Sequence, residues 1–120
     1  MRSKWITYKD HQIFYQDFSG YNLLESDTVK KELEEVQAVV LGEPPASVLV
    51  LSDFRDTQVG KDLIDLMVAS SRVTKSHIKK TAVVGVTGAK RFVANMLMSA
   101  TGQQLSLFES MEKAEEWLIQ

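Results

Sequence analysis

The chain has no cysteine among its 120 residues. This absence excludes disulfide bonds, thiol catalysis and metal sites built on cysteine. Long apolar runs are also missing, because no stretch approaches the roughly 18–20 residues that a membrane-spanning helix needs. The N-terminus lacks the apolar segment of a secretory signal. We therefore expect a soluble, cytoplasmic protein with no membrane span.

Histidine is scarce, and the two histidines, His11 and His77, lie far apart in the sequence. Neither has ligand-type neighbours at a spacing typical of a metal site. Neither follows a buried strand, where a histidine of a serine–histidine–aspartate site would be expected. The sequence therefore predicts no metal, no cofactor and no catalytic residue. We expect His77 to interact with the C-terminal end of the helix before it, where cations are stabilised.

Acidic residues are absent between Leu66 and Phe108, although this stretch carries six lysines and arginines. The acids gather instead near 32–35 and 112–116, and the net charge is −2. A balance this close to neutral does not favour nucleic-acid binding. One interpretation is that solvated helix faces simply alternate in sign. The other is a positive sector that attracts a small anionic ligand or an acidic partner.

The length and the hydrophobic content of 44% predict a single domain over residues 1–120 with one real core. Two apolar runs, 47–53 and 81–87, are the strongest structural signal. Each is rich in valine and leucine without alternation, ends in small polar residues and is followed by a helix-like pattern. Strands that are apolar on both faces are typical of parallel sheets covered on both sides.

The remaining elements follow from periodicity and turn residues. An aromatic-rich hairpin is expected over 5–16, and a helix with Val29, Leu33, Val36 and Val40 on one face is expected to end at Gly42 with positive φ. Further helices are expected near 60–76, 89–100 and after Ser110, and a short strand at 105–108. The order ββαβαβαβα predicts an α/β fold with a mixed sheet covered by about four helices.

Parallel sheets bind ligands at the carboxyl ends of their strands. After the first apolar run this region includes Asp53, Asp56 and Thr57. After the second it includes Thr87, Gly88, Lys90 and Arg91. We predict that these residues form a surface for a ligand or a protein partner.

The aspartates allow three chemical interpretations. Asp53 and Asp56 are three positions apart, whereas a haloacid-dehalogenase site needs two carboxylates two positions apart. Asp53 matches the phosphoacceptor of a receiver domain, but the accompanying acidic pair and lysine are not evident. A hydrolase that uses Asp53 is a further alternative. The structural interpretation, a turn former or helix cap, is favoured for both residues.

The segment 85–91 has a strand end, a glycine turn and two cations at a helix start. It lacks the glycine spacing of a phosphate loop. Cations at a helix N-terminus oppose the helix dipole, so an anion nearby would stabilise them. Three alternatives stay open: the anion is Asp53 or Asp56, it is a ligand phosphate, or there is no anion and the cations are simply exposed to solvent. For Gly85 the structural interpretation is tight packing of a helix on the strand.

Several segments together resemble the SpoIIAA-like branch of the STAS (anti-sigma factor antagonist) family. They are the strand 48–53 followed by Asp56-Thr57, the strand 82–85, and the C-terminal LFESMEKAEEWL at 107–118. The resemblance covers essentially the whole chain and implies a small α/β domain that acts by binding. In typical members of this bacterial family, a serine at the start of the second helix, preceded by aspartate, is phosphorylated by a partner kinase. That modification controls docking to an anti-sigma factor.

Asp56-Thr57 falls near that position, although the usual Asp-Ser-Ser-Gly-Leu context is absent. The resemblance therefore implies Thr57, with Ser52, as a candidate phosphoswitch. We expect a non-enzymatic regulatory or protein-interaction module. The alternative is a carrier of a small molecule or lipid in a cavity between the second and third helices, lined by Met67, Met96, Leu97 and Met98. The aromatic edge hairpin could also pair two copies into a homodimer.

Overall fold

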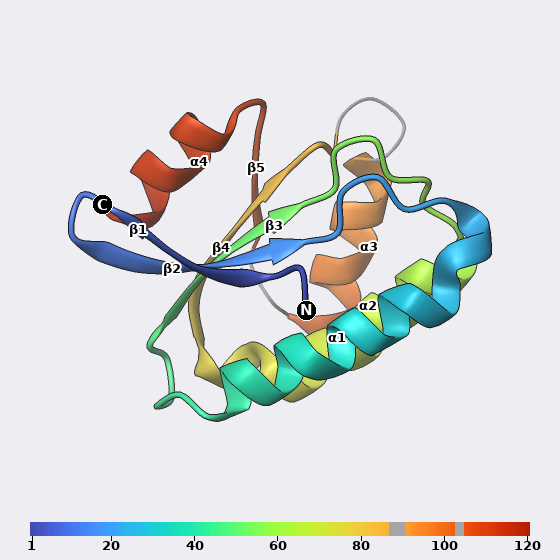
Figure 1. The fold of residues 1–120 in the computed structure, drawn as a ribbon, viewed down its shortest axis with the longest axis horizontal. Helices are drawn as coiled ribbons and strands as arrows, with labels where there is room; N and C mark the ends of the chain where they lie inside the picture. Colours follow the sequence, from blue (N-terminus) through green and yellow to red (C-terminus); the bar gives the residue numbers. More distant parts are fainter. Residues whose placement is uncertain (87–90, 103–104) are drawn as a thin grey trace.

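A computed structural model describes residues 1–86, 91–102 and 105–120 (Figure 1). Its strands are β1 (Lys4–Tyr8), β2 (His11–Asp17), β3 (Val48–Asp53), β4 (Ile78–Val84) and β5 (Leu105–Phe108). Its α-helices are α1 (Ser26–Leu41), α2 (Lys61–Thr74), α3 (Arg91–Thr101) and α4 (Met111–Leu118). Two 3₁₀ turns, η1 (Leu23–Glu25) and η2 (Lys75–His77), precede α1 and follow α2.

The strands form one sheet in the order β1-β2-β3-β4-β5. β1 pairs with β2 antiparallel, and the three other pairs are parallel. Helices α1, α2 and α3 cover one face of the sheet and α4 covers the other (Figure 1). The predicted mixed α/β sheet, the element order and the adjacency of the two apolar runs are therefore confirmed.

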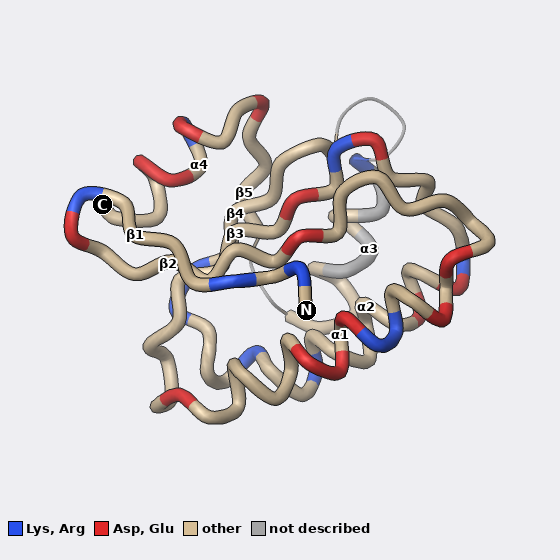
Figure 2. The backbone as a smooth tube through the Cα atoms, viewed as in Figure 1, with Lys and Arg blue, Asp and Glu red and all other residues tan. Residues whose placement is uncertain are grey.

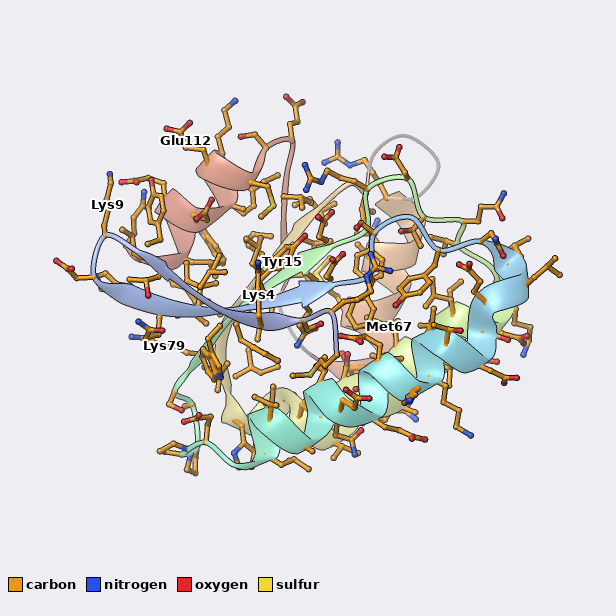
Figure 3. All side chains as sticks on the ribbon, in the orientation of Figure 1. Lys4, Lys9, Tyr15, Met67, Lys79 and Glu112 are labelled. Carbon is orange, nitrogen blue, oxygen red and sulfur yellow. The ribbon has the colours of Figure 1, made fainter. Side chains whose placement is uncertain are left out.

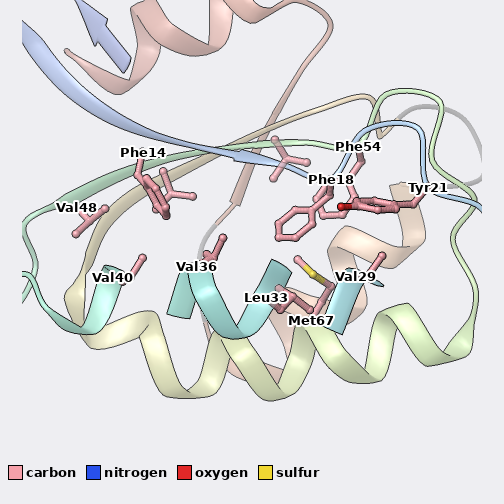
Figure 4. Close-up of a cluster of buried hydrophobic side chains, with 12 residues drawn as sticks. Phe14, Phe18, Tyr21, Val29, Leu33, Val36, Val40, Val48, Phe54 and Met67 are labelled. Carbon is pink, nitrogen blue, oxygen red and sulfur yellow. The ribbon is translucent and has the colours of Figure 1, made fainter. Parts of the chain in front are cut away.

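Strand β3 explains why its sequence does not alternate between apolar and polar residues. Val48 and Val50 pack in the larger core beneath α1 and α2, whereas Leu51 packs in a second core beneath α4. Because both faces are covered, both sets of side chains are apolar. Figure 4 shows the larger core, where phenylalanines from the sheet side meet α1 and Met67 of α2.

Helix α1 follows its predicted face, since Val29, Leu33, Val36 and Val40 are all buried. The prediction of a positive φ at Gly42 is wrong. Gly42 has a φ of −77°, and its N–H reaches the carbonyls of the last helical turn. The left-handed residue comes later, at Ala46 with a φ of +53°, after the two prolines have already ended the helix.

The β1–β2 hairpin turns at Lys9 and Asp10, which have φ values of +46° and +67°. Two positive φ values between the paired residues Tyr8 and His11 define a two-residue type I′ turn. Asparagine, aspartate and glycine are the residues that tolerate this geometry best. The sequence predicted the hairpin, but the lack of glycine left its turn type open.

Candidate functional site

The chain leaves β2, β3 and β4 at the same end of the sheet (Figure 1). Backbone hydrogen bonds join the first two exits: the amide of Phe18 donates to the carbonyl of Asp53 (3.0 Å), and Gly20 donates to Arg55 (3.0 Å). A third bond runs from Gln58 to Tyr21 (2.8 Å). We call the residues 17–22, 53–60 and 84–86 the strand-end rim. Its loops are held to one another rather than standing free.

Asp53 lies at the centre of a charged triad on the α4 side of the sheet. Its carboxylate is fully buried and accepts hydrogen bonds from the guanidinium of Arg55 (2.8 and 3.0 Å) and the hydroxyl of Tyr15 (2.6 Å). It also accepts from the backbone N–H of Arg55 (3.0 Å), which fixes the turn after β3. The Arg55 side chain is 53% exposed, so the pair reaches the surface through the arginine.

The triad shifts the titration of its members. Burial alone would raise the pKa of Asp53, but the hydrogen bonds from Arg55 and Tyr15 outweigh it and hold that pKa below its usual range. Burial and the hydrogen bond to Asp53 raise the pKa of Tyr15 to about 12. The hydrogen bonds and charge of Asp53 raise the pKa of Arg55 above its ordinary value. Asp53 is therefore an ionised carboxylate whose two oxygens are occupied by protein donors.

Gly85 joins the third exit to the other two through close backbone contact. It has a φ of +86°, and a Cβ at this position would lie 2.6 Å from the carbonyl carbon of Phe54 and 2.7 Å from the Cα of Arg55. The amide of Phe54 also donates to the carbonyl of Val84 (2.9 Å). The prediction that Gly85 serves helix packing is wrong, because its neighbour is the loop after β3.

Asp56 and Thr57 complete the turn that follows β3. Asp56 is exposed with a φ of +59°, and the amide of Thr57 donates to the carbonyl of Phe54 (3.3 Å). The Thr57 side chain is only 2% exposed, and its hydroxyl donates to the carbonyl of Phe18. Thr57 therefore fastens the β3 exit to the β2 exit.

The other predicted site residues are less closely grouped. Ser52 points away from Asp53, toward α1 and α2, and its buried hydroxyl donates to Oε1 of Gln16 (3.2 Å). Arg91 begins α3 and is exposed. Thr87, Gly88 and Lys90 lie outside the described residues. The structure thus brings Asp53, Asp56 and Thr57 to one rim and places Ser52 beneath it.

The acid-free stretch has a structural use that the sequence did not reveal. Arg72 and Lys75 donate to the carbonyls of Ala100 (3.2 Å) and Thr101 (2.9 Å) at the end of α3. Lys80 donates to the carbonyl of Trp117 (3.1 Å) at the end of α4. These cations satisfy the negative ends of helices. Figure 2 shows the complementary pattern, with acidic positions along α1 and α4.

His77 also contacts a backbone carbonyl near the end of a helix, but the helix is α1. Its Nδ1 lies 2.7 Å from the carbonyl of Glu43, just beyond the end of α1. This hydrogen bond lies at the end of α1, whereas the sequence led us to expect an interaction with the end of α2. All these contacts join residues that are far apart in sequence, so helical periodicity could not have revealed them.

A cavity of about 60 Å³ lies beneath the rim, between the sheet and α1, α2 and α3. Its lining is mostly apolar and includes the predicted Met67, while Gln16 and Ser52 form a polar corner. From α3 the described lining residue is Ala94. Met98 is not among the described lining residues, and the side chains of Met96 and Leu97 lie outside the described part of the chain.

The described residues hold no group of three or more histidines, aspartates or glutamates arranged for a metal ion. No helix in the same part of the chain is long and apolar enough to cross a membrane.

The arrangement is that of a small α/β domain with its strand exits gathered at one end. It is similar to a solved structure described as an uncharacterised protein of the DUF3478 family with a SpoIIAA-like fold, from Shewanella loihica PV-4. The TM-score is 0.72 at 11% identity, over 97% of this chain and 91% of that one. The chain therefore has a SpoIIAA-like fold, as its sequence predicted. No family model matches it, no curated protein matches it significantly, and no enzyme family is indicated.

Proposed function

We propose that this protein is a non-enzymatic protein-interaction module whose working surface is the strand-end rim. One observation carries the proposal. The buried polar groups of the rim, the Asp53 carboxylate and the Thr57 hydroxyl, are bound internally, while Leu23 and Leu24 beside the rim are exposed. Such a surface is suited to recognition by shape and apolar contact rather than to proton or group transfer.

The two leucines are presented by a fixed turn. Leu24 is 94% exposed and Leu23 is 60% exposed, both on η1. A capping box between Asn22 and Glu25 closes η1, and the amide of Leu23 donates to Oε1 of Gln58 (3.0 Å) in the rim. A hollow of about 270 Å³ lies between this turn and the start of α2. A partner that covers one leucine fully would gain about 1.5–3 kcal/mol from its burial.

The test is a capture experiment with matched variants. Tagged wild-type protein, Leu24→Gln and Leu41→Gln are incubated with extract of the native organism, and bound proteins are quantified by mass spectrometry. Leu41 is an exposed leucine at the far end of α1, so it controls for loss of surface hydrophobicity. We expect a partner that Leu41→Gln retains and Leu24→Gln loses by about tenfold or more. Equal retention by both variants would contradict the proposal.

Thr57 and Ser52 remain the predicted phosphorylation sites of this module, and their geometry defines what phosphorylation requires. A kinase must first release the Thr57 hydroxyl from the carbonyl of Phe18. The added charge of about −1.5 to −2 would then keep the β2 and β3 exits apart. Incubation with cell extract and ATP, followed by mass spectrometry, tests this directly. Modification of wild type that Thr57→Val abolishes is expected, and an unmodified chain would rule out the switch.

The second candidate function, a small-molecule or lipid carrier, is supported by the cavity beneath the rim. Its volume of about 60 Å³ is well below the roughly 150 Å³ of a cavity that binds benzene. A larger ligand therefore requires α2 and α3 to move away from the sheet. Native mass spectrometry of freshly purified protein would detect such a ligand. Ser71→Leu should displace it by filling the cavity, and Ala69→Leu, on the exposed side of α2, should not.

A further inference from the structure

Strand β1 is an edge of the sheet, and its hairpin register shows which backbone groups face outward. In a two-residue hairpin the residues that flank the turn, here Tyr8 and His11, exchange hydrogen bonds. Along an antiparallel pair, hydrogen-bonded pairs alternate with pairs that are not hydrogen-bonded. Trp5 and Thr7 belong to the second kind, so their N–H and C=O groups point away from β2. The amide of Ser3 agrees with this alternation, because it turns outward to Oε2 of Glu32 (2.8 Å).

The outward groups of Trp5 and Thr7 have no hydrogen-bond partner within the described part of the chain. Unpaired strand edges are templates for another strand. Here the free segment is short, because α1 occupies the edge at Ser3 through Glu32 and the turn begins at Lys9. Any added strand must therefore pair with residues 5–7.

We propose that the occupant of this edge is β1 of a second copy, antiparallel, with the two-fold axis passing beside Ile6. In this register Trp5 of one copy exchanges two hydrogen bonds with Thr7 of the partner subunit. By symmetry Thr7 does the same with Trp5 of the partner subunit. All four outward groups of Trp5 and Thr7 in each strand are then satisfied, and the two sheets become one.

The alternative antiparallel registers satisfy fewer groups. A shift that pairs Trp5 with itself places Thr7 opposite Ser3, whose amide is already bound to Glu32. A shift that pairs Thr7 with itself places Trp5 opposite Lys9, which lies in the turn with a positive φ. The register centred on Ile6 is therefore the one that the hairpin geometry favours.

Side chains on both faces of the edge fit this arrangement. Trp5 lies on the α1 side, packs on Phe14 (5.0 Å between ring centroids) and is still 40% exposed. Ile6 and Tyr8 lie on the α4 side in the second core. Across the two-fold axis Ile6 would contact Ile6 of the partner subunit, and the exposed part of Trp5 would be covered beside Thr7 of the partner subunit.

Charge complementarity supports a second copy as the occupant. Lys4 is exposed opposite Tyr15, on the α4 side of the sheet, and no acceptor pairs with it among the described residues (Figure 3). The proposed register places it opposite Tyr8 of the partner subunit. In each copy Oε2 of Glu116, on the acidic helix α4, accepts hydrogen bonds from the Tyr8 hydroxyl (2.7 Å) and from Nζ of Lys9 (2.9 Å). The second carboxylate oxygen, Oε1, has no hydrogen-bond donor among the described residues. Lys4 would therefore approach the carboxylate of Glu116 in the partner subunit.

This inference does not depend on the proposed function, because the rim lies at the ends of the strands and stays open in the dimer. The test uses Thr7→Pro, which removes one outward N–H and leaves the bonds to β2 in place. Thr7→Val is the control, since it keeps the N–H. Sedimentation equilibrium is run from roughly 1 µM to 1 mM, because small interfaces associate weakly.

Wild type and Thr7→Val are expected to approach about 27 kDa, twice the chain mass of 13.5 kDa. Thr7→Pro is expected to stay at 13.5 kDa with an unchanged circular dichroism spectrum. A monomeric wild type at every concentration, or a Thr7→Pro dimer of equal strength, would overturn the proposal. Lys4→Glu should weaken the dimer by about tenfold or more. A tighter dimer with Lys4→Met would show that Lys4 opposes pairing and overturn the charge contact.

Discussion

Ser52 and Asp53 are neighbours in sequence, yet they lie on opposite faces of the sheet in different environments. Ser52 faces the α1–α2 side, beside a cavity, and makes one neutral hydrogen bond to Gln16. Asp53 faces the α4 side, where Arg55 and Tyr15 occupy its carboxylate. The comparison teaches that the rim is fixed from the charged side, whereas the opposite side retains space. We therefore expect substitutions on the two sides to cause losses of stability that differ in size and in pH dependence.

Gly85→Ala should cause the largest loss of stability, because the added methyl group would push the β4 exit away from the β3 exit, and both sides of the rim depend on that contact. The left-handed φ and the overlap with the Phe54–Arg55 backbone each cost about 1–3 kcal/mol. Gly20→Ala is the control, since Gly20 has a φ of +75° but open space around its Cβ position. Urea unfolding should therefore show a clearly larger loss for Gly85→Ala. Equal losses would mean that the close contact between the two loops does not exist.

Arg55→Met should cause the second-largest loss of stability, because it leaves the buried Asp53 without its charged partner. Removing one member of a buried ion pair costs about 3–5 kcal/mol, and the exposed side of Arg55 places the effect at the lower end. Arg55→Lys keeps the charge but loses the two-pronged geometry, so it should fall between wild type and Arg55→Met. If Arg55→Met unfolds at the wild-type urea concentration, the triad does not fix the rim.

The charged side should also give stability a pH dependence. The pKa of Asp53 is lower in the folded chain than its ordinary value, so the stability it contributes is present above the unfolded pKa near 3.8 and is lost as the pH falls through the folded pKa. The lowered pKa of Glu32 adds to this loss, although its burial alone would raise it. Asp53→Asn should therefore be less stable than wild type at neutral pH, and the difference should shrink in acid. A difference that is constant down to acid pH would contradict the lowered pKa.

Ser52→Ala should have the smallest effect. It removes one neutral hydrogen bond, worth about 1 kcal/mol, and leaves Oε1 of Gln16 beside the cavity. Ser47→Ala removes an exposed hydroxyl bound to the carbonyl of Pro44 and should change stability less. Urea unfolding at several pH values should show a Ser52→Ala loss that does not depend on pH. A loss as large as that of Arg55→Met would remove the distinction between the two sides.

The fold was predictable where burial leaves a local pattern in the sequence. The unbroken apolar runs predicted β3 and β4, and the stripe of Val29, Leu33, Val36 and Val40 predicted α1. Ser110 predicted the start of α4, and its hydroxyl accepts a hydrogen bond from the amide of Lys113. These signals are local, because each depends on which face of an element is buried or on a single cap.

The site was less predictable because its contacts are not local. Arg55 lies two residues from Asp53, but Tyr15 reaches the Asp53 carboxylate only because of the register between β2 and β3. The contact of Gly85 with the loop after β3 likewise joins two strand exits. Thr57 was singled out for its hydroxyl, and nothing in the sequence indicates that Phe18 accepts from it. Strand ends could be located from the sequence, but the partners of their side chains could not.

The most direct test of the account is the titration of the Asp53 carboxyl followed by carbon-13 NMR. The account depends on this carboxylate being held in its ionised form by Arg55 and Tyr15. It predicts a midpoint below the ordinary pKa of 3.8 for aspartate. A midpoint at or above that value would show a carboxyl group free to carry a proton, and it would contradict a rim that acts through its shape.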